Sequence, residues 1–361
     1  MKRIYLSLIA VFATVSLIYA QNSSPNYLTM RWTRVANGMP TAWYGSEEAK
    51  RIAENVLISQ RDIGGWEKNQ PYHRVFSDSL KKSYISKKGQ IGATFDNGAT
   101  TTELKFLAKV YAQQKDERYR EAFLKGLNYI FIAQYENGGW PQFYPVRNAA
   151  NAGSRNKSVP YSAHITYNDD AMVNIMLFLK AVYTNHANFV SLNLDEQTKN
   201  KAKEVFNRGV DCILKSQIVV DNTPTVWCAQ HDYKTLAPTK ARSYELASFS
   251  GAESASIVML LMDIEKPSKE IVAAVNGAVQ WFENHKIENV RVQRSRDENG
   301  KWNTIVVEDK NAKPLWGRFH DLETGKIYFS SRDGVKKDSI DEIDAERRNG
   351  YSWYTNRPQE V

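Results

Sequence analysis

Phe106-Leu107-Ala108-Lys109-Val110-Tyr111 is repeated almost unchanged as Phe178-Leu179-Lys180-Ala181-Val182-Tyr183, and this repeat decides the fold. In both stretches apolar residues recur at intervals of three and four, which is typical of an amphipathic helix. A second helical pattern follows each stretch, over about 118–134 and 195–217, so the repeated unit is a pair of helices. A repeated pair packs against its neighbours, because each pair leaves apolar surface that it does not cover alone.

A third pair is predicted over 257–263 and 271–281, and a leading helix over 46–60. Matching helix ends are marked by Gln60, Gln134 and Gln217. Three helix pairs with a leading helix can close into a ring of inner and outer helices. The predicted fold is therefore mainly α, an (α/α)3 toroid.

The pattern changes to alternation of apolar and polar residues after Trp281, which predicts a small C-terminal β appendage. One hairpin is predicted from 290–294 and 305–308, with a turn at 297–300. Another is predicted from Trp316 to Gly334, and it would bring Arg318 and Arg332 close together on paired strands. The β-hairpin region spans about 287–334, within a single domain of residues 46–361 that follows a lead-in of residues 21–45.

The first twenty residues have the features of a secretory signal peptide: Lys2-Arg3, an apolar run and then Ala20. We therefore expect a secreted or periplasmic protein with no membrane anchor. Removal of residues 1–20 reduces the 48 basic residues to 46 and leaves the 40 acidic ones, so the net charge is +6. This modest surplus suits an acidic partner, and export favours an acidic polysaccharide over nucleic acid. Cys212 and Cys228 are either paired in a disulfide or free.

Acidic and amide side chains precede two of the predicted inner helices. Asp96-Asn97 lies before one helix and Asn168-Asp169-Asp170 before the next. Asp and Asn commonly cap helix N-termini, but only one residue of a run can occupy that position. Hard oxygen ligands gathered at one end of a toroid suit Ca²⁺. The candidate metal ligands are Asp96, Asn97, Asp169 and Asp170.

A long polar loop separates the second and third helix pairs, and such loops frequently carry function. It contains cationic residues that can pair with substrate carboxylates, Arg242 as a fork and Lys240 as a point charge. An aromatic ring such as that of Trp227 either stacks on a sugar or closes the core. The candidate substrate-binding residues of this loop are Trp227, His231, Lys240, Arg242 and Tyr244.

Five motifs of the chain resemble those of the pectate lyases of polysaccharide lyase family 10, and they occur in the same order as in that family. The resemblance covers about 46–358. The motifs are Gly64-Gly65-Trp66-Glu67-Lys68-Asn69, Thr94-Phe95-Asp96-Asn97-Gly98-Ala99-Thr100, Tyr167-Asn168-Asp169-Asp170-Ala171-Met172, Ala241-Arg242-Ser243-Tyr244-Glu245, and Gly317-Arg318-Phe319 with Ser331-Arg332-Asp333-Gly334.

The resemblance implies an (α/α)3 toroid that cleaves de-esterified homogalacturonan by Ca²⁺-assisted β-elimination, giving 4,5-unsaturated products. It implies Asp96 and Asn97, with Asp169 or Asp170, around the calcium. It also implies Arg332 as the Brønsted base, with Asp96 as the other catalytic residue. Arg242 and Arg318 would bind galacturonate carboxylates.

An arginine base requires a pKa well below the usual value, because almost no guanidinium is neutral at ordinary pH. Crowding by Ca²⁺ and by Arg318 is expected to lower the pKa of Arg332 and to give an alkaline optimum.

Two other functions are compatible with the sequence. One is a glycoside hydrolase of unsaturated oligogalacturonides, with Asp96 and Asp170 as its two carboxylic acids. The other is a non-catalytic protein that binds acidic glycans. For the pectate lyase we expect polygalacturonate as substrate, no nucleic-acid or membrane partner, and a monomer.

Overall fold

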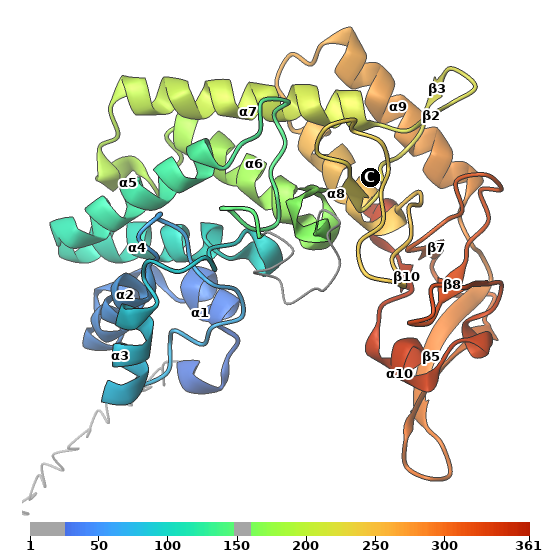
Figure 1. Cartoon of the computed structure of the whole chain (residues 1–361), viewed down its shortest axis with the longest axis horizontal. Helices are drawn as coiled ribbons and strands as arrows, with labels where there is room; N and C mark the ends of the chain where they lie inside the picture. The colour runs from blue at the N-terminus through green and yellow to red at the C-terminus, as the bar shows by residue number, and fades with distance from the viewer. Residues whose placement is uncertain (1–25, 148–159) are drawn as a thin grey trace, which may run out of the picture.

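The computed structural model describes residues 26–147 and 160–361, and it confirms the toroid of repeated helix pairs with a small β part. The expected signal peptide, residues 1–20, lies outside the described residues. The helix pairs follow one another around an arc (Figure 1). They are α4 (Thr101–Gln114) with α5 (Glu117–Ile132), α6 (Ala171–Tyr183) with α7 (Glu196–Ser216), and α8 (Gly251–Met262) with α9 (Lys269–Asn284).

The leading helix α2 (Glu47–Ser59) packs against α4 and α5, as expected. Two further helices of the N-terminal part were not predicted, α1 (Trp32–Gly38) and α3 (Asp78–Ser86). Helix α1 lies within the expected lead-in and packs on α4, where the Trp32 indole donates to Glu103 Oε1 at 2.6 Å. This part of the lead-in therefore belongs to the folded domain.

Three glutamines hold successive pairs in register. Each one ends an outer helix and donates from its amide nitrogen to two backbone carbonyls, one in its own turn and one on the next outer helix. The contacts are Gln60 to Gly64 (2.8 Å) and Ala122 (2.9 Å), Gln134 to Gly138 (2.9 Å) and Val205 (2.9 Å), and Gln217 to Thr225 (2.8 Å) and Ala274 (2.9 Å). The matching helix ends seen in the sequence are thus matching joints between pairs.

Four buried tryptophans follow the outer helices, and each indole N–H donates to a carbonyl of the helix before it. The bonds are Trp66 to Val56 (2.8 Å), Trp140 to Ile130 (2.9 Å), Trp227 to Ile213 (2.7 Å) and Trp316 to Phe282 (2.8 Å). None of the four side chains is more than a few per cent exposed. They close the core, and this applies to Trp227, which was a candidate for sugar stacking.

The segments before the inner helices meet these tryptophan turns in the same way three times. The backbone N–H of Thr94, Thr166 and Ser250 donates to the carbonyl of Trp66, Trp140 and Trp227, at 3.0, 3.2 and 2.8 Å. The starts of α4, α6 and α8 are therefore placed by one repeated hydrogen bond. The short 3-10 turns η3 (Asp96–Gly98) and η5 (Asn168–Asp170), which precede α4 and α6, contact each other.

The C-terminal part contains the hairpin of β5 (Val290–Arg296) and β6 (Trp302–Glu308), as predicted. The second predicted hairpin is confirmed at its turn, and the predicted pairing of its strands is wrong. Strand β7 (Trp316–Gly317) pairs with β10 (Tyr354–Thr355), and β8 (Phe329–Ser330) pairs with β9 (Lys336–Lys337). The chain does fold back at an isolated bridge between His320 and Ile327, but Arg318 and Arg332 are not on paired strands.

The remaining described elements are short. Strand β1 (Ile165–Thr166) pairs with β4 (Gln230–His231), and β2 (Val219–Val220) with β3 (Thr223–Pro224). Helix α10 (Ala345–Gly350) precedes β10. A second apolar cluster joins these C-terminal segments around Phe319, Tyr328 and Trp353. In the described part of the chain, no helix has the length and apolar character needed to cross a membrane.

Candidate active site

Turns η3 and η5 are two copies of the same backbone conformation. Their middle residues, Asn97 and Asp169, have φ/ψ of 54°/31° and 52°/31°, and the third residue of each turn also has positive φ. Asp, Asn and Gly tolerate this left-handed region better than other residues. Because the copies contact each other, their polar side chains gather at one end of the toroid.

Asp96 supplies a buried carboxylate with one free oxygen. Its side chain is 3% exposed, and the Lys68 ammonium donates to Oδ2. Oδ1 is buried and has no hydrogen-bond partner among the described residues. Asn97 is exposed, and its amide donates to Asn69 Oδ1 at 3.0 Å.

Asp169 supplies the second carboxylate. The Asn168 amide donates to its Oδ2 at 2.9 Å, and Arg318 Nη2 lies 3.7 Å from its Oδ1. Burial raises the pKa of Asp169, and the charges of Asp96 and Glu253 raise it further, although Arg318 opposes this. A carboxyl in this position gains from a cation placed between it and Asp96.

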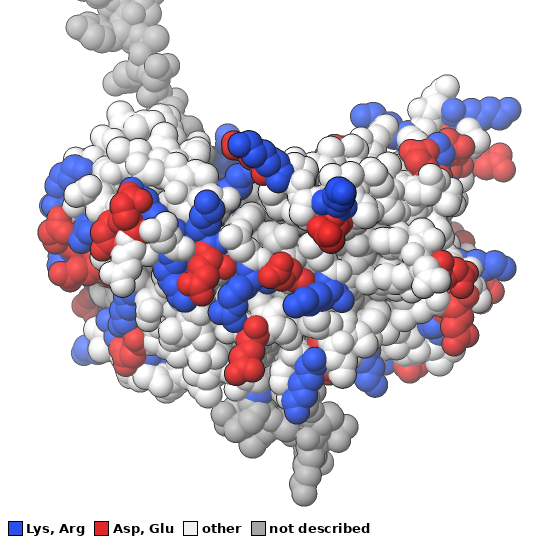
Figure 2. Space-filling view, turned by 90° about the horizontal axis from the view of Figure 1, so that it is seen from above, with Lys and Arg blue, Asp and Glu red and all other residues white. Residues whose placement is uncertain are grey.

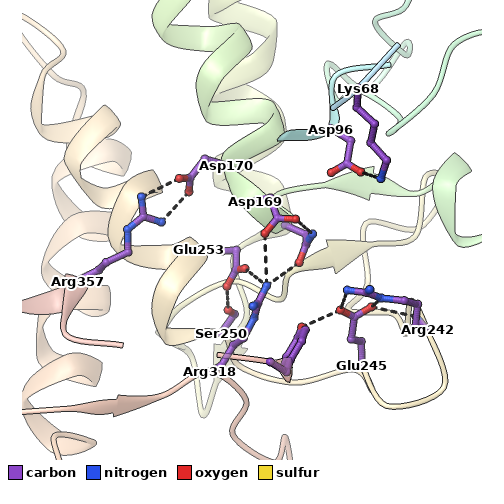
Figure 3. Close-up of polar contacts among 12 residues, drawn as sticks. Lys68, Asp96, Asp169, Asp170, Arg242, Glu245, Ser250, Glu253, Arg318 and Arg357 are labelled. Carbon is purple, nitrogen blue, oxygen red and sulfur yellow. Dashed lines mark hydrogen bonds and ion pairs between the residues drawn. The ribbon is translucent and has the colours of Figure 1, made fainter. Parts of the chain in front are cut away.

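Asp170 points away from Asp169 and toward Arg357 (Figure 3). The pair is bidentate, with Arg357 Nη1 at 3.0 Å from Oδ1 and Nη2 at 2.7 Å from Oδ2. Of the two adjacent acids, Asp169 is therefore the one that shares its surroundings with Asp96.

Arg318 is partly buried beside Asp169, with 12% of its side chain exposed. Its Nη2 donates to Glu253 Oε1 at 3.0 Å and to Asn168 Oδ1 at 2.8 Å, and Ser250 donates to the other Glu253 oxygen. Burial alone would lower the pKa of Arg318, but Glu253 and the neighbouring groups raise it overall. Glu253, at the start of the third inner helix, was not among the predicted site residues.

Arg242 lies near the same space, opposite Lys68 and Asp96 (Figure 3). It pairs with Glu245, with Nε 2.7 Å from Oε2, and the Tyr351 hydroxyl donates to Oε1 of the same carboxylate at 2.7 Å. The Glu245 hydrogen bond raises the pKa of Arg242. The charge of Arg242 also acts on Asp169, whose pKa it lowers.

Arg332 lies at the edge of this group, with its guanidinium 5.8 Å from the Tyr244 ring that Arg242 also covers. Its side chain is 63% exposed, and it pairs with Glu346, with Nη2 2.9 Å from Oε1. That pairing raises the pKa of Arg332, which is the opposite of the expected lowering.

His231 is a packing residue in this structure. It is fully buried, Nδ1 donates to the Leu236 carbonyl at 2.8 Å, and Nε2 accepts from the Cys228 N–H at 3.0 Å. Burial lowers its pKa to about 4, so the ring is neutral.

The same arrangement recurs at His320, because 227–235 and 316–324 share the pattern W-x3-H-D-x2-T. Nδ1 of His320 also donates to a carbonyl, that of Gly325, at 3.0 Å. In both copies the Asp after the His accepts from the backbone and hydroxyl of the Thr. This duplication was present in the sequence, and it identifies the His as part of a structural turn.

The other loop candidates differ in exposure. Tyr244 is buried, with the guanidiniums of Arg242 and Arg347 over its ring at 4.9 and 4.6 Å. Lys240 is exposed and forms no ion pair within the described part of the chain. Cys212 and Cys228 are buried and free, so they do not form a disulfide.

Charged side chains of both signs are interspersed over the face of the molecule shown in Figure 2. This face therefore carries no extended field of one sign. No group of three His, Cys, Asp or Glu with metal-binding geometry occurs within 26–147 and 160–361. Asp96 and Asp169 are thus two protein carboxylates, not a complete ligand set.

Comparison with known proteins identifies the class. The pectic acid lyase family matches residues 60–361. The structure is similar to the family 10 polysaccharide lyase from Cellvibrio cellulosa, at 33% identity over 89% of this chain and 92% of that one, with a TM-score of 0.73. It is also similar to a mutant of that lyase in complex with trigalacturonic acid, at 33% identity over 91% and 93% of the two chains, with a TM-score of 0.74. No curated protein sequence matches.

A helical toroid with these matches is a polysaccharide lyase. The chain belongs to polysaccharide lyase family 10, the pectic acid lyases, as its motifs predicted.

Proposed function

We propose that the enzyme cleaves de-esterified homogalacturonan, α-1,4-polygalacturonate, by calcium-assisted β-elimination and releases 4,5-unsaturated oligogalacturonides. The observation that carries this proposal is the free, buried Asp96 Oδ1 next to Asp169, with Arg318 and Arg242 close by. The complex of a related lyase with trigalacturonic acid supports the choice of substrate.

Calcium fits the donors that the chain offers. Asp96 and Asp169 would hold the ion together with the amide oxygen of Asn97, which is in the same turn as Asp96. All three are hard oxygen donors. Since Ca²⁺ takes six to eight oxygens, water and substrate carboxylates would complete the shell. When bound, the ion neutralises the uronate carboxylate and so acidifies the C5 proton.

The residues must then remove that proton. The base takes the C5 proton, the C4–C5 double bond forms, the C4–O4 bond breaks, and the leaving oxygen takes a proton from water. We propose Arg242 as the base in place of Arg332. Arg242 lies in the electrostatic field of Asp169, whereas the groups that shift the pKa of Arg332 include no carboxylate of the site.

Arg242 must leave Glu245 to act as a base, because that ion pair stabilises the charged guanidinium. A substrate carboxylate would compete with Glu245 for the Arg242 guanidinium. Since the neutral fraction of any guanidinium rises with pH, the optimum should be alkaline. Arg318 would hold Asp169 and stabilise the enolate-like charge, and Arg332 would bind a uronate at the rim.

The test compares Arg242→Lys with Arg332→Lys. Release of unsaturated uronates is followed by ultraviolet absorbance with calcium and then with a chelator, and substrate binding is measured by calorimetry. We expect Arg242→Lys to lose nearly all turnover with binding retained, and Arg332→Lys to raise KM. The reverse result would return the base role to Arg332. A rate that is unchanged by the chelator would show that the reaction does not require calcium.

The two alternatives fit less well. A hydrolase needs Asp96 and Asp170 on either side of one bond, but Asp170 is paired with Arg357 and points elsewhere. A non-catalytic role does not fit a chain that belongs to a family of lyases.

We also propose that the protein is exported through the expected signal peptide and acts as a monomer. N-terminal sequencing of the secreted product and its mass in solution test these two points.

A further inference from the structure

A pocket of about 650 Å³ opens beside turn η3, apart from the arginines of the C-terminal part. Three segments form it: residues 29–33 at the start of α1, residues 67–74 after the first tryptophan turn, and residues 97–103 at the start of α4. None of the predicted substrate-binding residues lies in these segments. The pocket is therefore unexplained by the site as described.

The pocket is continuous with the carboxylate centre, by which we mean the site formed by Asp96 and Asp169. Asn97 lines it and directly follows Asp96 in turn η3. Asn69, also in the lining, accepts the Asn97 amide hydrogen bond at 3.0 Å, and its neighbour Lys68 pairs with Asp96. A polymer that passes Asp96 on this side therefore enters the pocket.

The lining carries arginines and amides that suit an acidic sugar, and its two carboxylates already have partners: Glu67 pairs with Arg61, and Glu103 accepts from Trp32 and from the Thr100 N–H. Arg31 and Arg74 are exposed, and neither forms an ion pair within residues 26–147 and 160–361. Their guanidiniums are thus available as planar forks for a carboxylate. The amides of Asn69 and Asn97 add hydrogen-bonding groups that suit ring hydroxyls.

The aromatic wall of the pocket is rigid. The Trp32 indole is held by its hydrogen bond to Glu103, and its ring lies parallel to that of His73 at 6.2 Å. The Arg74 carbonyl accepts from Arg51 and from Asn55, at 3.0 and 2.9 Å. Replacement of the Arg31 or Arg74 side chain therefore leaves the pocket walls in place.

We propose that this pocket is a distal subsite that binds a galacturonate unit of the polymer, with its carboxylate between Arg31 and Arg74. This rests on the proposed substrate class, and it extends the binding surface from the carboxylate centre across α1. The subsite acts on longer chains only, because the shortest substrates end before they reach it.

The test uses Arg31→Ala/Arg74→Ala, with Arg34→Ala as control. Arg34 is an exposed arginine on the same helix that does not line the pocket. Oligogalacturonates of increasing length, from the trimer upward, are titrated by calorimetry with a chelator present, and kcat and KM are measured with calcium. Wild type and Arg34→Ala should gain affinity when the chain becomes long enough to fill the subsite.

The double variant should lose that gain, with affinity for long oligomers lowered about tenfold or more. Equal length dependence in all three proteins would overturn the subsite. Because binding is measured without turnover, a wild-type enzyme that binds long oligomers but does not cleave them would refute the lyase substrate and leave the subsite standing.

Discussion

Asp169→Asn and Asp170→Asn form a matched pair that decides which acid binds calcium. The two residues are adjacent, and both have left-handed backbones, with φ of 52° and 58°. Asn is as compatible with that region as Asp, so neither change should disturb turn η5. Asp169 shares its surroundings with Asp96, whereas Asp170 is paired with Arg357. We expect only Asp169→Asn to weaken calcium binding strongly.

The size of the effect follows from the charge that is removed. A carboxylate about 4 Å from a dication, at an effective dielectric constant of about 20, contributes about 8 kcal/mol of gross attraction. Dehydration of the two ions offsets about half of this. The remaining ~4 kcal/mol corresponds to a dissociation constant about a thousandfold higher. The Asp170 pair is partly exposed, so its loss should change calcium affinity by less than about threefold.

The assay is calorimetric titration of calcium into metal-free protein, with the melting temperature of each variant as a check on folding. The calcium concentration that gives half-maximal lyase rate is measured in parallel. An equal loss in both variants would mean that turn η5 acts as one unit. A larger loss in Asp170→Asn would refute the argument from side-chain direction.

Three further predictions concern the glutamine hydrogen bonds between helix pairs, the buried His231 and the pH dependence of calcium binding. Gln134→Ala should lower the free energy of unfolding by about 2–4 kcal/mol, measured by chemical denaturation, because the carbonyls of Gly138 and Val205 lose their donor. The control is Gln113→Ala, at an exposed position, which should change this free energy by less than about 0.5 kcal/mol. His231→Ala should cost about 2 kcal/mol in the same assay without changing KM for polygalacturonate; a raised KM would restore its substrate role. Calcium affinity should fall on acidification as Asp169 takes up a proton, beginning at a higher pH than for an exposed Asp, because burial raises its pKa. Glu253→Gln should move that fall to lower pH, since it removes a charge that raises the pKa of Asp169; calcium titrations over a pH series would show an unmoved or opposite shift if this is wrong.

Most of the helical architecture could be predicted because its signals are local. The leading helix predicted over 46–60 is Glu47–Ser59, and the second helices predicted over 118–134 and 195–217 correspond to α5 and α7. The matching glutamines also indicated equivalent helix ends, and the structure shows that each one bonds across to the next outer helix.

Strand partners could not be predicted in the same way. Alternation around Trp316 and Phe329 predicts strands, but it carries no information about which segment lies beside them. The partner of β7 comes from Tyr354, near the C-terminal end, so the pairing is not local. The choice between Asp169 and Asp170 had the same difficulty, because Arg357 draws one of them away from the site.

The site arises where the copies of the repeat differ. In turn η3 the order is Asp96 then Asn97, and in turn η5 it is Asn168 then Asp169, on the same backbone. Asn168 occupies the position equivalent to Asp96. Its uncharged amide oxygen accepts a hydrogen bond from Arg318, whereas a carboxylate at this position would be neutralised by that arginine. The carboxylate is moved one residue along, to the middle of the turn.

The third repeat lacks the turn, since α8 begins directly after Ser250. In this repeat Glu253 accepts the second hydrogen bond from Arg318 Nη2. Residues that are the same in every copy, such as the glutamines and tryptophans, join the helix pairs. Residues that differ at equivalent positions carry the charges of the site. In a toroid built from repeats, comparison of the copies therefore separates folding residues from functional ones within a single sequence, and here it selects Asp96, Asp169 and Glu253.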